Sequence, residues 1–200
     1  MTRGECLKML APLMTDHLVV TSQSGQRIEW SHFSEHDGNL LLGQMGCALG
    51  VGAGLSLALP HRKVVVLESD GSVLLSLFNL PTLARLNPAD LAVYVFDNGV
   101  YSGSRISEPT ATGGRANLEA LAKAAGIRNA MTIRSARAFK KDGVAWLNKK
   151  GLRFVVCKVE ESLLHREIPR PTIDLAENKY KFVRYLERTE GKPITFVGRG

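Results

Sequence analysis

Two polar side chains, each next to a glycine, follow two apolar runs of the chain. Asp70 lies in "ESDGS" after the run "KVVVLE", and Asn98 lies in "DNGVY" after "LAVYVF", 28 positions beyond Asp70. A carboxylate oxygen and an amide oxygen are the hard ligands that Mg²⁺ and Ca²⁺ prefer, and phosphate oxygens and water often complete such a shell. Gly71 permits close approach of the backbone, and Ser72 stands where a helix with free N–H groups would begin. Together these residues predict a divalent metal that holds a phosphorylated ligand.

Taken singly, the same residues have simpler explanations. Asp-Gly-Ser is a common turn and helix cap, and Asn-Gly is a common turn. The spacing of the two stretches and the buried runs before them therefore favour the site more than any one residue does.

The apolar runs predict the elements that would position these groups. Residues 63–69 and 91–98 are apolar on both faces, which is typical of central parallel strands covered by helices. Further strands are expected at residues 17–22, 130–134 and 153–160. Helices are expected at residues 3–14, 71–87, 117–127, 135–149 and 179–191. A short helix is also expected after residue 25, and another in the glycine-rich part of residues 40–60. Residues 99–114 read as a long flexible loop, and residues 166–179 as irregular.

This alternation predicts an α/β fold, a doubly wound and mainly parallel sheet with helices on both faces. Ligands bind outside the carboxyl ends of the strands in such sheets, which is where Asp70 and Asn98 fall. Pro60 ends the glycine-rich helix, and Pro81 should kink or restart the helix at 71–87 because its ring removes a hydrogen bond.

Length and composition indicate one domain. The 200 residues, 44% of them hydrophobic, suit one α/β layer structure, which we place at residues 1–170. Residues 171–200 form a tail with an amphipathic helix, in which Phe182 and Tyr185 are three apart, and which packs on the domain or on a partner.

Charge and cysteine content exclude several classes of function. The net charge of +7 comes from scattered basic groups without interleaved aromatic residues, so we expect no nucleic-acid partner, only a solvated surface or attraction of an anionic substrate. The 3 cysteines contain no CxxC pair, which disfavours a disulfide framework or a zinc site and favours a cytoplasmic location. No apolar stretch is long enough to span a membrane unaided.

Three other functions share part of this pattern. A phosphatase of the haloacid dehalogenase type needs a nucleophilic aspartate where this chain has Glu68, whose longer side chain would misplace the oxygen. A dinucleotide-binding fold is disfavoured because the glycines of "GVGAG" lie inside a helix and do not follow a strand. A cofactor-binding module without catalytic activity stays open.

The order of the motifs resembles that of thiamine diphosphate enzymes. In that family a strand ends in Gly-Asp-Gly and a second strand, some two dozen residues later, ends in Asn; here "SDG" is followed by 26 residues before Asn98. "GQMG" within 43–46 is similar to the family's Gly-x-Met-Gly segment, and "RPTIDLAENKYKFVRYLERTEG" resembles the end of decarboxylases acting on sulfopyruvate and phosphonopyruvate. Ser69 departs from the family, which has glycine there.

The resemblance implies a set of site residues. Asp70, Asn98 and the backbone carbonyl of Val100 would bind Mg²⁺, and Gly43 and Met45 would hold the pyrimidine ring of thiamine diphosphate, with the Met45 side chain beneath the bent cofactor. The full set of cofactor-binding residues that it implies is Ser22, Ser24, Gly43, Gln44, Met45, Gly71, Ser72 and Tyr101.

The resemblance also implies a partner and a substrate class. Members of the family use a glutamate from a separate pyrimidine-binding domain, so we expect a pyrimidine-domain (α) subunit that completes the site in a hetero-oligomer. The substrate would be a small anionic 2-oxo acid such as sulfopyruvate or phosphonopyruvate, and the reaction decarboxylation, with carboligation and oxidative chemistry left open. Groups that could supply positive charge or proton transfer are His36, His165, Arg166 and Arg170.

Overall fold

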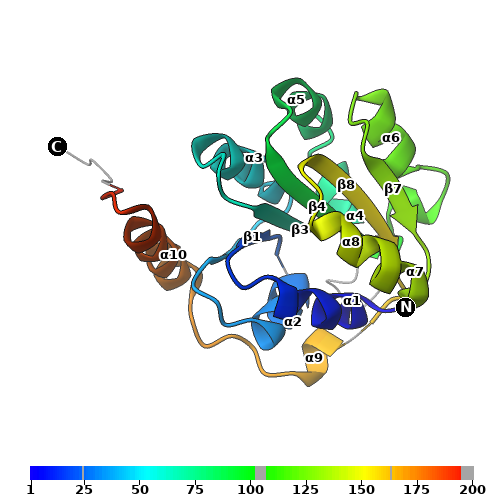
Figure 1. Cartoon of the computed structure of the whole chain (residues 1–200). Coiled ribbons are helices and arrows are strands. Elements are labelled where there is room, and N and C mark those ends of the chain that lie inside the picture. Colours follow the sequence, from blue (N-terminus) through cyan, green and yellow to red (C-terminus); the bar gives the residue numbers. More distant parts are fainter. Residues whose placement is uncertain (24, 102–106, 163, 195–200) are drawn as a thin grey trace.

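A parallel sheet of 6 strands forms the centre of the computed structural model, which describes residues 1–23, 25–101, 107–162 and 164–194 (Figure 1). The strand order is β2-β1-β3-β4-β8-β7, and every neighbouring pair is parallel. The strands are β1 (Leu18–Thr21), β2 (Asn39–Leu41), β3 (Val64–Ser69), β4 (Asp90–Asp97), β7 (Ala130–Ile133) and β8 (Gly151–Lys158). The predicted fold class is therefore confirmed.

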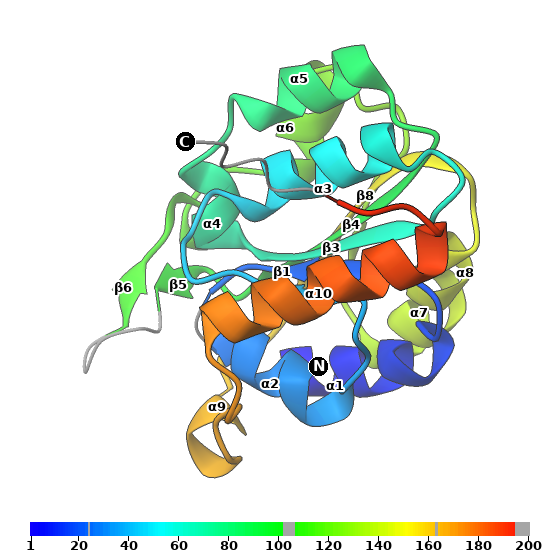
Figure 2. The same ribbon diagram turned by 90° about the vertical axis from the view of Figure 1, so that its left-hand side faces the viewer.

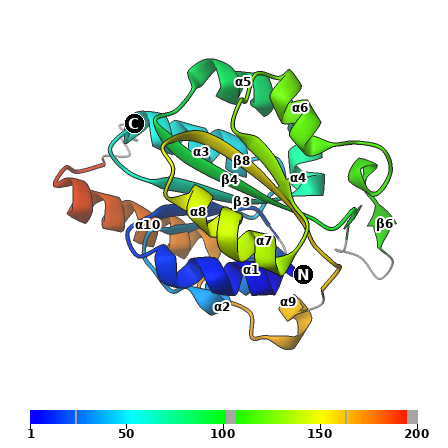
Figure 3. The ribbon, with the colours of Figure 1, turned by 45° about the vertical axis from the view of Figure 1, so that its right-hand side comes forward.

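Helices cover both faces of this sheet (Figures 1 and 3). One face carries α3 (Ala48–Ala58), α5 (Asn79–Leu86) and α6 (Leu118–Ala124). The other carries α1 (Arg3–Leu10), α2 (Gly25–Phe33), α7 (Ala136–Ala138) and α8 (Val144–Leu147). Successive side chains of a strand point to opposite faces, so Val64 and Val66 of β3 enter one core, and Val65 and Leu67 enter the other. This two-sided burial explains why β3 reads as a continuous apolar run.

The order of the strands changes direction at β1. The chain passes from β1 to β2 on one side and then returns to β3 on the other side. Such a reversal leaves a crevice outside the carboxyl ends of the two diverging strands, and ligands of doubly wound folds bind there. Asp70 follows β3 directly, as the first residue of the short helix α4 (Asp70–Leu74).

The helix expected at 71–87 is divided in two. α4 ends at Leu74 and α5 begins at Asn79, so that Pro81 lies in the first turn of α5. The N–H groups of a first helical turn have no partner within the helix, so proline is tolerated there. The helix thus restarts around Pro81, as expected.

Other boundaries differ from the expectations. The segment 99–114 contains a short antiparallel ribbon, β5 (Val100–Tyr101) with β6 (Glu108–Pro109), and a 3₁₀ turn, Ala111–Gly113. The first helix ends at Leu10 and continues as a 3₁₀ turn, Ala11–Leu13; the helix at 135–149 contains a π-helical turn, Phe139–Gly143.

The segment expected to be irregular, 166–179, holds the end of α9 (Leu164–Glu167) and the start of α10 (Leu175–Glu190). α10 begins early because the Asp174 side chain accepts a hydrogen bond of 2.8 Å from the Glu177 N–H and so caps the helix.

Helix α10 runs along the edge of the sheet beside β2 (Figure 2). The Leu41 N–H donates to Asn178 Oδ1 at 2.8 Å, and Asn178 Nδ2 donates to the Asn39 carbonyl at 3.0 Å. Phe182, Tyr185 and Leu186 join the same core as α3 and α5.

In the described part of the chain, every helix is too short or too polar to cross a lipid bilayer.

Candidate functional site

A cavity of about 140 Å³ opens at the carboxyl ends of β1, β3 and β4. It brings together residues that the sequence places far apart but predicts as one site: Met45, Gly71, Asn98, Val100 and Tyr101. The remaining lining residues are Arg3, Gln23, Gly25, Gln26, Ser69, Phe96 and His165. The cavity lies at the crevice that the strand order creates, so the fold and the motifs indicate the same place.

Asp70 is buried next to this cavity, with 1% of its surface exposed. Its Oδ2 accepts hydrogen bonds from the hydroxyls of Thr110 at 2.6 Å and Thr112 at 2.8 Å, whereas Oδ1 has no hydrogen-bond partner among the described residues. Burial raises the pKa of Asp70, and the two threonine hydroxyls act against this rise. A buried carboxylate with one unpaired oxygen is costly unless a cation binds it, so Asp70 fits a metal ligand.

The neighbouring oxygens also fit a hard cation. Asn98 and Val100 line the cavity, and the Val100 N–H donates to Asn98 Oδ1 at 3.2 Å, which orients the amide. Within the described residues, no three His, Cys, Asp or Glu side chains gather at one point. A metal held here would take amide, backbone, water and ligand oxygens beside the Asp70 carboxylate, a set that suits Mg²⁺ bound to phosphate.

Ser22 and Ser72 are almost fully buried and do not line the cavity. Ser72 Oγ accepts a hydrogen bond of 2.8 Å from the Gly46 N–H, and the Ser22 N–H donates to the Leu67 carbonyl at 3.0 Å. Ser72 thus connects α4 to the loop that contains Gly46, and the Ser22 backbone extends the pairing of β1 with β3. Ser24 lies outside the described residues.

The segment after β2 contributes one side chain to the cavity. Met45 lines the cavity, while Gly43 and Gln44 are exposed and do not line it.

Gly71 and Tyr101 lie against each other. A Cβ on Gly71 would collide with the Tyr101 ring. The glycine is thus needed for Tyr101 to cover this part of the cavity.

Ser69 occupies the position where the resembling family has glycine. Its backbone is extended, with φ −106° and ψ 158°, a conformation that any residue adopts. Its hydroxyl accepts a hydrogen bond of 3.4 Å from the Ser72 N–H and caps α4. Serine is therefore compatible with the backbone geometry at this position.

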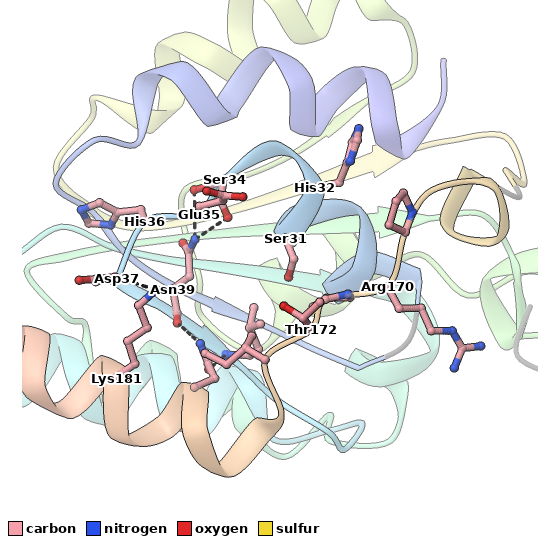
Figure 4. A pocket seen from close by; sticks show the side chains of 15 residues that line it. Ser31, His32, Ser34, Glu35, His36, Asp37, Asn39, Arg170, Thr172 and Lys181 are labelled. Atoms are coloured by element: carbon pink, nitrogen blue, oxygen red, sulfur yellow. Dashed lines mark hydrogen bonds and ion pairs between the residues drawn. The ribbon is translucent and has the colours of Figure 1, made fainter.

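The candidate substrate-binding residues are not brought together. His165 lines the cavity described above, and Arg166 is exposed. His36 and Arg170 line a second, larger cavity of about 420 Å³ and lie at opposite ends of it (Figure 4). The buried amides of that second cavity, Asn39 and Asn178, are already hydrogen-bonded, to Trp30, Ser34 and the backbone of β2.

Sequence reasoning missed the threonines that hold Asp70. Thr110 and Thr112 lie in the segment expected to be a flexible loop, and both are buried. One residue separates the two threonines in the chain, and both of their hydroxyls donate to the same oxygen of the Asp70 carboxylate. A Thr-x-Thr pair in a loop carries no specific signal, so only the folded chain identifies them.

Comparisons with known proteins agree with this geometry. The family model described as "Thiamine pyrophosphate enzyme, C-terminal TPP binding domain" matches residues 23–157. "Sulfopyruvate decarboxylase subunit beta" of Methanocaldococcus jannaschii is 33% identical over 152 residues, 74% of this chain and 77% of that relative. The protein of the same description from Methanococcus maripaludis is 28% identical over 193 residues, 94% of this chain and 99% of that relative.

A solved structure shows the same fold. The X-ray structure of a thiamin diphosphate-dependent enzyme from Mycobacterium smegmatis superimposes with a TM-score of 0.68 at 17% identity. The match covers 81% of this chain and 32% of that chain. At this identity the likeness concerns the fold alone.

Proposed function

We infer the function of this chain from its family: the chain belongs to the thiamine pyrophosphate enzymes and contains their C-terminal TPP binding domain. The resemblance read from the motifs is confirmed by this family match. The proposal is that the chain binds Mg²⁺ and the diphosphate of thiamine diphosphate, as one subunit of a 2-oxo acid decarboxylase. The observation that carries it is the unpaired Oδ1 of the buried Asp70 at the carboxyl end of β3.

The residues around Asp70 have proposed tasks in metal binding. Asp70, the Asn98 side chain and the Val100 carbonyl hold Mg²⁺, with Thr110 and Thr112 fixing the Asp70 carboxylate. Because Asp70 uses Oδ2 for the threonines, Oδ1 is left to the metal.

Met45, Gly71 and Tyr101 shape the cavity for the organic part of the cofactor. When bound, thiamine diphosphate supplies an electron sink for the electrons left behind as CO₂ departs.

The substrate and partner are proposed from the relatives. Both relatives described above are named subunit beta of sulfopyruvate decarboxylase, so we propose a small anionic 2-oxo acid as substrate and an α subunit as partner. Gly43 and Gln44, which the motif assigns to the pyrimidine ring, are exposed in this chain. A pyrimidine-binding domain of the partner would cover them and supply the missing glutamate.

The metal assignment is tested by Asp70→Asn. This variant keeps the volume of the side chain but removes the charge that Mg²⁺ requires, so Mg²⁺-dependent binding of thiamine diphosphate should fall at least about 100-fold in titration calorimetry. Asp142→Asn, in the π-helical turn away from the cavity, is the matched control and should bind like the unaltered chain. Unchanged binding by Asp70→Asn, with circular dichroism showing a folded domain, would contradict the metal site.

A further inference from the structure

A third cavity, of about 250 Å³, lies between helix α2 and the segment that leads into α10. Its lining comes from Arg27 and Ile28 of α2, Leu41 of β2, and positions 170, 171 and 173–175. None of these residues lines the cavity of about 140 Å³ that is assigned above to the cofactor. We refer to the third cavity as the arginine cavity, because Arg27 and Arg170 both line it.

The two arginines of this cavity have no counter-ion in the described part of the chain. Arg27 is half-buried and Arg170 is exposed, and no described carboxylate forms an ion pair with either guanidinium. Burial lowers the pKa of Arg27, and the positive charge of Arg170 lowers it further. The two guanidinium groups are therefore close enough to repel each other, and an anion between them would remove this repulsion.

The acidic side chains near the arginine cavity are engaged elsewhere. Asp174 is the one acidic residue among its described lining residues, and Asp174 Oδ1 accepts a hydrogen bond of 2.8 Å from the Glu177 N–H as the cap of α10. In the neighbouring cavity of about 420 Å³, Asp37 pairs with Lys181 at 3.0 Å and lies at the opposite end from Arg170 (Figure 4). A counter-ion for the arginines would therefore come from outside the described residues.

The rest of the arginine cavity is apolar. Ile28 and Leu41 are buried, and Pro171, Ile173 and Leu175 form further apolar lining. Sites for small organic ligands typically combine such a lining with a few polar groups that fix the orientation of the ligand. A hydrated inorganic ion would leave the apolar surface without a partner, so the cavity suits an anion that carries a short hydrocarbon body.

The number of donors indicates the kind of anionic group. A guanidinium donates two parallel hydrogen bonds to one planar carboxylate, so a single carboxylate is matched by one arginine. A tetrahedral oxyanion has additional oxygens that face other directions and can accept from a second guanidinium. Phosphonates, phosphate monoesters and sulfonates share this geometry.

We propose that the arginine cavity is a ligand site, separate from the cofactor cavity, for a small organic anion with a tetrahedral oxyanion head. The head binds between Arg27 and Arg170, and the hydrocarbon body packs on Ile28 and Leu41. This inference goes beyond the proposed function and does not depend on it, because the two cavities have no described lining residue in common.

Arg27→Gln and Arg170→Gln test the site. Glutamine keeps a long polar side chain and a similar helix propensity but removes the charge. Since each change also removes repulsion between two cations, thermal stability without ligand should be unchanged or higher. Arg170 lies outside the helices, so its variant keeps the test valid if Arg27→Gln unfolds. Arg137→Gln, exposed in α7, is the matched control.

The readout is calorimetric affinity for butylphosphonate, butanesulfonate and inorganic phosphate. The unaltered chain should bind at least one of the two butyl compounds in a saturable way, and inorganic phosphate about 10-fold or more weakly, because phosphate lacks the apolar body. Each arginine variant should lose about 10-fold or more in affinity for the butyl compound, as expected for a lost hydrogen bond between charged groups. Arg137→Gln should bind like the unaltered chain. The relative affinities of the phosphonate and the sulfonate then identify the head group that the cavity prefers.

A competition experiment separates this site from the cofactor cavity. Thiamine diphosphate with Mg²⁺ should leave the affinity for the butyl compound unchanged. Displacement by thiamine diphosphate, equal binding by folded arginine variants, or no saturable binding of either butyl compound would overturn the arginine cavity as a ligand site. None of these three results bears on whether Asp70 holds Mg²⁺.

Discussion

At the scale of single residues, the site divides into residues that a pattern predicts and residues that only folding brings together. That Asp70 and Asn98 lie at one edge of the sheet was predictable, because each follows a predicted strand and the carboxyl ends of parallel strands meet at one edge; Met45 was expected there from the family resemblance. Arg3 was not predictable. It reaches the cavity through its ion pair with Glu29, 26 positions away on another helix, and no local pattern encodes such a contact.

Glu68 shows how a structure limits the chemistry of a single residue. The sequence disfavoured it as a phosphatase nucleophile because of its length. In the structure it is also fully buried, and burial raises the pKa of its carboxyl to about 7, with the Ser72 hydroxyl as the largest opposing influence. A side chain that a substrate does not reach is unsuited to nucleophilic attack.

His17 carries a prediction about pH. It precedes β1, at the end of the strand away from the candidate site, and is 6% exposed; burial, and then the Lys63 ammonium, lower its pKa to about 4. The unfolded chain, with an ordinary histidine pKa of about 6.5, therefore binds this proton at a higher pH than the folded chain does. The contribution of His17 to the free energy of unfolding should be fully present above pH 6.5 and fall by up to about 3 kcal/mol as the pH is lowered to 4.

Urea denaturation at several pH values measures this effect. His17→Leu should lose less stability than the unaltered chain between pH 7 and 4, while His32→Leu should follow the unaltered chain. Identical slopes for all three proteins would show that His17 is protonated equally in the folded and unfolded states.

At the scale of helices and strands, long periodic segments were predictable and short ones were not. β3 and β4 are buried on both faces, so their sequences are continuous apolar runs that few other structures explain. β5 and β6 have only 2 residues each and pair with each other, so their existence depends on where the surrounding elements place them. The start of α10 was missed because its cap, Asp174, follows a proline-rich stretch.

Helix α10 leads to a prediction about the folding unit. We propose that α10 folds together with the domain, since Asn178 pairs both a backbone donor and a backbone acceptor of β2. Asn178→Leu would leave the Leu41 N–H and the Asn39 carbonyl unpaired at a buried edge, so the free energy of unfolding should fall by about 3 kcal/mol.

Urea denaturation followed by fluorescence and by circular dichroism measures this loss, and one coincident transition is expected. Asn148→Leu, an exposed asparagine at the end of α8, is the matched control and should change stability by less than about 0.5 kcal/mol. Two separate transitions, or an unaltered midpoint for Asn178→Leu, would mean that α10 is a detachable tail.

At the scale of the whole molecule, the cavity is built from the start and end of the chain as well as from the family domain. Arg3 of α1 and His165 of α9 line it, and the exposed Gly43 and Gln44 precede the lining residue Met45 in the chain. We propose that the side formed by this chain binds a metal and a diphosphate, whereas the glutamate that the resembling family uses belongs to a separate domain. The proposed activity therefore requires a pyrimidine-binding domain, which we propose that a partner subunit supplies.

This requirement gives the last prediction. The purified chain should bind thiamine diphosphate with Mg²⁺ but release no CO₂ from sulfopyruvate or phosphonopyruvate, because the pyrimidine-binding half of the site is proposed to come from the partner subunit. Addition of an α subunit that carries this half should start CO₂ release, and the same α subunit with the Asp70→Asn chain should not. Sustained CO₂ release by the chain alone would refute the divided site, and cofactor binding without turnover under any pairing would favour a non-catalytic binding module.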